Sequence, residues 1–101
     1  MSYRCRLHEK AQLDYEASLE WYAVRSIKAA ENFIQEVEYA FQLIIDNPLR
    51  WRNEYKNFRE LGLKKYPFVI VYTVEESEEL VTIIAIFHTS RNPNKKYRKL
   101  Q

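Results

Sequence analysis

A chain of 101 residues and 12.3 kDa has the size of one domain and is long enough to bury a core. It is 47% hydrophobic and 30% charged, which argues against disorder, and no apolar run approaches the roughly 20 residues needed to span a bilayer. The formal net charge of +2 does not by itself indicate binding to nucleic acid. One cysteine cannot form an internal disulfide, and one cysteine with two histidines does not make a zinc site, so we expect no metal and no cofactor.

The first half of the chain predicts a strand and two helices. In residues 2–8 apolar and charged side chains alternate, which predicts a strand. The N-terminal residues are charged and do not form the apolar core of a signal peptide, so we expect a cytoplasmic protein with no membrane partner. From Glu9 to Val24 apolar residues recur every three or four positions, which predicts a helix. Ser26 can cap a second helix that should end near 46–47, before Pro48. Because the break is short, the helices should form an antiparallel hairpin.

The second half predicts three strands, at 58–65, 68–74 and 80–87, with the acidic segment 75–79 as a tight connection. We therefore predict an α+β fold: an N-terminal strand, an antiparallel helical hairpin, then a three-stranded antiparallel meander, with both helices on one face of the sheet. Residues 1–101 should form a single domain, with a basic tail at about 92–101.

The charge is divided unevenly along the chain. Residues 8–46 carry eight acids and three bases, and residues 75–79 carry four acids. Residues 50–72 carry six bases and two acids, and the stretch from 88 to the end carries five bases and no acid. This division predicts a cationic surface that faces an acidic partner or a phosphate-bearing target.

The candidate target- or phosphate-binding residues are the cations of the second half and one neighbouring tyrosine: Arg59, Lys64, Lys65, Arg91, Lys95, Lys96 and Tyr97. His88 ends the last predicted strand and adds an imidazole, a side chain that often serves as a general acid or base. If the strands pair as predicted, these ends can converge on the face or edge that the helices leave open, where arginine and lysine hold phosphates or an acidic protein. Lys64 and Lys65 are explained equally well as solvated lysines that discourage sheet-to-sheet aggregation.

The order of several short motifs resembles the RelE/ParE superfamily of toxins over nearly the whole chain. The motifs are Ala11-x-x-Asp14, Asn47-Pro48, Phe58-Arg59-Glu60-Leu61, Phe68-Val69-Ile70-Val71-Tyr72 and Ile86-Phe87-His88-Thr89-Ser90-Arg91-Asn92-Pro93. The resemblance implies a small bacterial toxin of a type II toxin–antitoxin system, neutralised by a cognate antitoxin that wraps it with a segment ordering on binding.

The resemblance leaves the target open between two classes. RelE-like members are metal-independent nucleases that cut messenger RNA in the ribosomal A site, whereas ParE-like members poison DNA gyrase. RelE-like nucleases typically place an arginine in the central strand, and residues 68–72 contain none. Under a nuclease interpretation the catalytic residues are His88, Arg91 and Arg59, with His88 as acid or base and Arg91 as phosphate clamp.

The ending His88-x-x-Arg91-x-Pro93 resembles ParE-like members more closely, so gyrase poisoning is the favoured prediction. Ribosome-dependent cleavage of messenger RNA is the first alternative. The second is a non-toxic binding module that keeps the fold and the partner groove without the target activity, because fold does not fix function.

Overall fold

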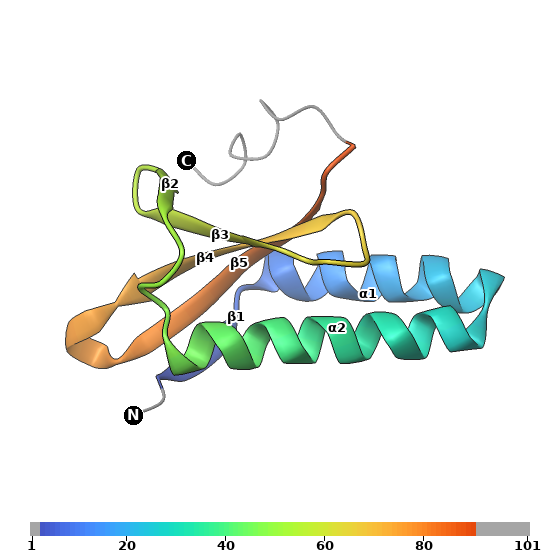
Figure 1. Cartoon of the computed structure of the whole chain (residues 1–101), viewed down its shortest axis with the longest axis horizontal. Coiled ribbons are helices and arrows are strands. Elements are labelled where there is room, and N and C mark those ends of the chain that lie inside the picture. Colours follow the sequence, from blue (N-terminus) through green and yellow to red (C-terminus); the bar gives the residue numbers. More distant parts are fainter. Residues whose placement is uncertain (1–2, 91–101) are drawn as a thin grey trace.

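Two helices lie on one face of a five-stranded sheet in the computed structural model, which describes residues 3–90 (Figure 1). The elements in chain order are β1 (Arg4–Leu7), α1 (Glu9–Arg25), α2 (Ile27–Asp46), β2 (Asn53–Tyr55), β3 (Phe58–Gly62), β4 (Phe68–Glu75), a 3-10 turn (Glu76–Glu78) and β5 (Leu80–His88). The predicted fold class, a strand, a helical hairpin and an antiparallel meander, is confirmed.

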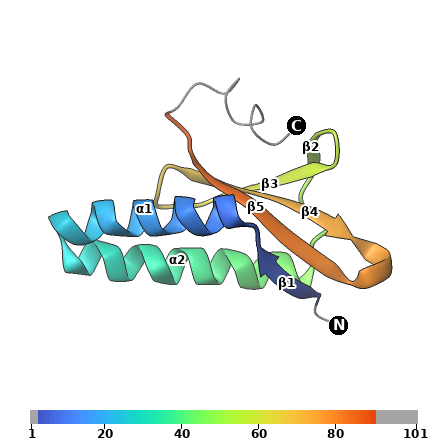
Figure 2. The ribbon, with the colours of Figure 1, turned by 180° about the vertical axis from the view of Figure 1, so that it is seen from behind.

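The sheet order is β1-β5-β4-β3-β2, so β4 is the central strand. The meander β3-β4-β5 is antiparallel, whereas β1 runs parallel to β5, beside which Figure 2 shows it. The sequence analysis did not predict β2, a three-residue strand in a polar run that lacks apolar alternation. β2 pairs with β3 across a turn in which Lys56 adopts a positive φ of 52°. The predicted strand at 58–65 ends earlier, at Gly62.

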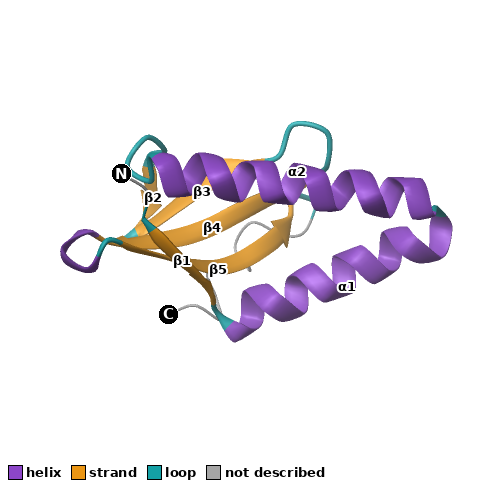
Figure 3. Cartoon of the chain, turned by 90° about the horizontal axis from the view of Figure 1, so that it is seen from below, coloured by secondary structure: helices purple, strands orange, loops and turns teal. Residues whose placement is uncertain are grey.

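Ser26 ends α1 and begins α2. Its backbone N–H donates to the Tyr22 carbonyl at 2.7 Å, and its Oγ accepts the Ala29 N–H at 3.1 Å. Because Ser26 itself is extended, with φ −165° and ψ 119°, the chain reverses within one residue. The cap predicted at Ser26 is confirmed, as is the end of the second helix at Asp46. The tip of the hairpin projects beyond the sheet (Figure 1 and Figure 3).

The main core lies between the helices and the sheet. α2 buries five side chains on one face, Ala30, Phe33, Val37, Ala40 and Ile44, and the last four belong to this core. The Phe33 ring lies 5.1 Å from the ring of Tyr22 and 5.4 Å from that of Phe68, centroid to centroid. A smaller cluster of Phe58, Val71 and Ala85 occupies the opposite face of the sheet.

One irregularity in β5 decides which side chains face the helices. Val71 pairs with Ala85 and Tyr72 pairs with Ile83, so Ile84 is an extra residue, a β-bulge. Side chains normally alternate between faces, yet Ile83 and Ile86 both belong to the helix-side core because the bulge shifts the alternation. Within residues 3–90, no helix is long and apolar enough to cross a membrane.

Candidate functional site

His88 lies at the end of β5, directly opposite Phe68 on β4. Its ring meets the Phe68 ring edge-on, with the centroids 5.0 Å apart and the planes at 83°. The Ser90 backbone N–H donates to His88 Nδ1 at 3.1 Å, and Ser90 Oγ lies 2.6 Å from the same nitrogen. Since a backbone N–H can only donate, Nδ1 is an acceptor, and the neutral ring carries its proton on Nε2.

A groove of about 600 Å³ separates α1 from this end of the sheet. It is lined by Asp14, Ala17, Ser18, Trp21 and Tyr22 of α1, by Pro67 and Phe68, and by Ile86 and His88 of β5. A mostly apolar wall with a few polar groups, at this volume, is typical of a site that accepts a small molecule or the side chains of a peptide.

One rim of the groove is an exposed tryptophan. The Trp21 side chain is 53% exposed, and the Arg25 guanidinium lies 3.7 Å from the centre of its ring. Leu13 and Val24 of the same helix are also exposed, at 58% and 77%. α1 therefore carries an apolar stripe that faces away from the core and adjoins the groove.

Arg59 lies elsewhere, on β3, between the central strand β4 and the edge strand β2. Its guanidinium donates to the Trp51 carbonyl at 2.5 Å, and its register partner on β4 is Tyr72. The Tyr72 hydroxyl donates to the Pro48 carbonyl at 2.6 Å. Burial raises the pKa of Tyr72 to about 12, and the charge of Arg59 opposes that rise. Arg59 and Tyr72 thus bind the backbone that leads from α2 to β2.

The structure does not bring Arg59 and His88 together. Arg59 pairs with Tyr72, and His88 pairs with Phe68, which precedes Tyr72 by four residues on β4. Four strand residues span about 13 Å, and the two side chains come from strands on opposite sides of β4. Two of the three residues assigned to a nuclease therefore lie on different strands, four residues apart along β4.

Lys64 and Lys65 lie exposed in the loop between β3 and β4, at the same end of the sheet as His88. The Lys65 backbone N–H donates to Glu36 Oε1 on α2 at 3.1 Å, and the loop's Pro67 carbonyl accepts the Thr89 N–H at 2.8 Å. The other candidate residues, Arg91, Lys95, Lys96 and Tyr97, lie outside the described residues. In residues 3–90, no group of three or more His, Cys, Asp or Glu side chains could hold a metal ion.

Sequence reasoning did not assign Asp14 and Trp21 to a site. Asp14 was noted as part of a family motif, and the spacing of Lys10 and Asp14, four residues apart on a helix, was the available signal of an ion pair. Trp21 follows Leu13 and Ala17 at helical spacing, which marks a second apolar stripe beside the core-facing one.

A family model described as the ParE toxin of the type II toxin–antitoxin system parDE matches residues 5–93. No curated protein matches the sequence.

Solved structures share the fold at low sequence identity. The chain is similar to a structure of the chromosomal ParDE toxin–antitoxin system from P. aeruginosa, with 21% identity and a TM-score of 0.72 over 86% of this chain and 96% of that one. It is similar to a chain of the RelBE2 toxin–antitoxin complex from Mycobacterium tuberculosis, with 18% identity and a TM-score of 0.60 over 90% and 95%. It also resembles the isolated E. coli RelE toxin, with 13% identity and a TM-score of 0.61 over 99% and 100%.

Proposed function

We propose a function from one premise: the chain belongs to the ParE toxin family of type II toxin–antitoxin systems. In this proposal the protein arrests bacterial growth by poisoning DNA gyrase and is neutralised by a cognate antitoxin. The observation that carries the proposal is the family match across residues 5–93, on a fold shared with a ParDE toxin–antitoxin system.

The groove beside α1 supports the partner part of the proposal. Its wall includes the rings of Trp21, Tyr22 and Phe68, and Trp21 is half-exposed. A segment that orders on binding gains affinity from apolar area and aromatic anchors of this kind, which offset its ordering entropy. We therefore assign the groove and the adjoining stripe of α1 to the antitoxin.

The positions of the cations favour a protein target over RNA cleavage. Cutting RNA through its 2′-hydroxyl requires a base, an acid and cations around one phosphate. Arg59 donates to the Trp51 carbonyl and is separated from His88 by four residues along β4. The exposed Lys64 and Lys65, at the His88 end of the sheet, are in contrast available to an acidic protein surface.

Ribosome-dependent cleavage of messenger RNA remains the second candidate because of one observation. The His88 ring lines the groove with Nδ1 accepting the Ser90 N–H, so its Nε2–H can donate a hydrogen bond to a phosphate oxygen. In this alternative, His88→Ala abolishes cutting of translated message while the fold is kept.

Induced expression in a bacterium tests the toxin assignment. We expect growth arrest that is relieved when the cognate antitoxin protein is expressed with it. A chain that binds this protein yet leaves growth unchanged is a non-toxic binding module instead, and the toxin assignment is then wrong.

A supercoiling assay with purified gyrase tests the target. Folded protein should inhibit supercoiling and accumulate cleaved DNA, and the same protein preincubated with its antitoxin should do neither. A parallel translation reaction reports on the alternative. Uninhibited gyrase together with cut message would replace the gyrase proposal with the nuclease.

A further inference from the structure

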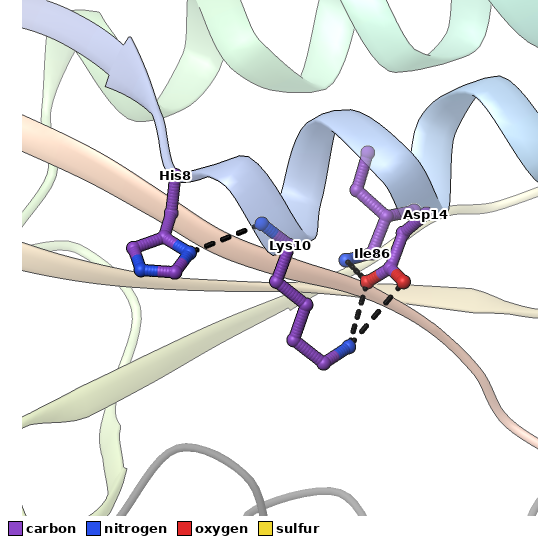
Figure 4. A network of polar contacts seen from close by, with 4 residues as sticks. All are labelled: His8, Lys10, Asp14 and Ile86. Carbon is purple, nitrogen blue, oxygen red and sulfur yellow. Dashed lines mark hydrogen bonds and ion pairs between the residues drawn. The ribbon is translucent and has the colours of Figure 1, made fainter.

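Asp14 contacts the edge of β5 at the point where β1 ends. β1 pairs with β5 from Leu80 to Ile83, and its last link is the His8 N–H, which donates to the Ile83 carbonyl at 2.8 Å. The chain then turns into α1. Three residues further along β5, the Ile86 N–H donates to Asp14 Oδ2 at 3.0 Å (Figure 4). A helix carboxylate thus takes the bond that a neighbouring strand would otherwise make.

Lys10 completes this contact from one helical turn earlier. Its Nζ lies 3.0 Å from Asp14 Oδ2 and 3.3 Å from Oδ1, and the side chains of Lys10 and Asp14 are 27% and 17% exposed. The Lys10 backbone N–H donates to His8 Nδ1 at 3.1 Å, which caps the helix (Figure 4). The start of α1 is therefore fixed to β5 at two points, His8 and Asp14.

The second point lies inside the groove. Asp14 and Ile86 both line it, and His88 follows Ile86 by two residues on the same side of β5. α1 supplies the facing wall, including Trp21. The bond between Asp14 and Ile86 therefore joins the two walls of the groove, two residues before His88.

We infer that Asp14 is a positioning residue: its carboxylate, neutralised by Lys10, holds the end of β5 against α1 and so fixes the shape of the groove and the orientation of His88. The bond itself is a property of the free protein. Its effect on antitoxin affinity rests on the function proposed above.

Asp14→Ala removes both the strand bond and the ion pair, and Asp14→Asn keeps a carbonyl oxygen that can accept the Ile86 N–H. Lys10→Met removes only the ion pair. Glu16→Ala is the matched control, because Glu16 is an exposed carboxylate on the same helix whose side chain bonds to Gln12. Thermal melts confirm that each variant is folded.

Amide hydrogen exchange and the His88 ring resonances, measured by NMR on the free protein, test the inference directly. In Asp14→Ala we expect exchange at Ile86 to accelerate by about tenfold or more relative to Phe87, which pairs with Val69 on β4, and the His88 resonances to shift. Asp14→Asn should restore both readouts most of the way, and Glu16→Ala should match the wild type.

Calorimetric titration with the antitoxin adds the functional readout. We expect Asp14→Ala to weaken binding about tenfold and Glu16→Ala to leave it unchanged. Unchanged Ile86 exchange or unchanged His88 resonances in folded Asp14→Ala would overturn the inference, whether or not the protein is toxic. If Asp14→Ala does not fold, the wild type decides: an Ile86 amide that exchanges as fast as an unprotected amide overturns the inference. Altered NMR readouts with no antitoxin binding in the wild type would keep the inference and reject the proposed function.

Discussion

The two helices of the hairpin are similar in length and differ in what they bury. α2 places five side chains fully in the core, whereas α1 places only Ala11 there and packs Tyr15, Leu19 and Tyr22 partly against it. The large apolar residues that α1 exposes are Leu13, Trp21 and Val24, and those that α2 exposes are Ile27 and Tyr39. The free energy of burial scales with the apolar area removed from water, so α2 should carry stability and α1 should carry an interaction surface.

The largest expected effect comes from the centre of α2. Phe33→Ala removes a fully buried ring that contacts Tyr15, Tyr22, Tyr66 and Phe68. We expect it to lower the free energy of unfolding by about 3–5 kcal/mol, because truncating a buried Phe loses transfer free energy and leaves a cavity. Urea unfolding measures the loss. If Phe33→Ala lowers the free energy of unfolding no more than Trp21→Ala does, the proposed difference between the two helices is wrong.

Loss of the hydrogen bond between Tyr72 and Pro48, just after α2, should have a smaller effect on stability. Tyr72→Phe removes the hydroxyl that donates to the Pro48 carbonyl, and we expect a loss of about 1–2 kcal/mol because that carbonyl is left without the bond in a buried place.

The same residue predicts a pH dependence. The pKa of Tyr72 is raised to about 12 in the folded protein, against 10 for an exposed tyrosine. Between these values the unfolded chain binds fewer protons, so stability falls as pH rises. The contribution of Tyr72 is complete below pH 10 and is lost as pH rises toward 12. Unfolding curves from pH 8 to 12 should therefore fall less steeply for Tyr72→Phe, and parallel curves for both proteins would refute this assignment.

Loss of the cap between the two helices should lower the free energy of unfolding by about 1 kcal/mol. Ser26→Ala removes the Oγ that accepts the Ala29 N–H, which is the cap of α2. A thermal melt should show a modest fall in Tm, and Ser26→Asp should retain most of the stability because aspartate also caps helices. If Asp and Ala variants melt alike, the side-chain cap contributes little.

The smallest effect on stability should come from the exposed stripe of α1. Trp21→Ala removes a ring that is 53% exposed, and we expect the free energy of unfolding to change by about 0.5 kcal/mol or less. Its affinity for the antitoxin should nevertheless fall by about tenfold or more, since half-exposed aromatic anchors dominate such interfaces. Glu16→Ala on the same helix is the control. If both variants bind the antitoxin as tightly as the wild type, Trp21 is not part of the proposed interface.

Much of the fold was predictable because it depends on local patterns. Ser26 and Pro48 mark the helix boundaries through capping and backbone sterics, and the spacing of Phe33 and Val37 marks the buried face of α2. β2 was missed because its three residues pair with β3 across a turn in which Lys56, not glycine, adopts the positive φ. The parallel pairing of β1 with β5 joins residues about 76 positions apart, which no local pattern encodes.

The candidate site, like the fold, was predictable from the sequence only in part. The position of His88 at a strand end follows from the apolar run before it, but its face depends on the bulge at Ile84. Arg59 was predicted beside a strand, and only the register of β3 and β4 separates it from His88. The role of Asp14 depends on an N–H that comes from Ile86, 72 residues away.

The sequence by itself determined the α+β class, the helical hairpin with its caps, the meander and the resemblance to RelE/ParE toxins, because helical and strand periods, proline and capping side chains act over a few residues. The tertiary structure alone decided which cations lie apart, which face His88 occupies and that α1 borders a groove. These depend on strand register, on one extra residue in β5 and on a hydrogen bond between distant segments, all of which are set only when the sheet and helices pack together.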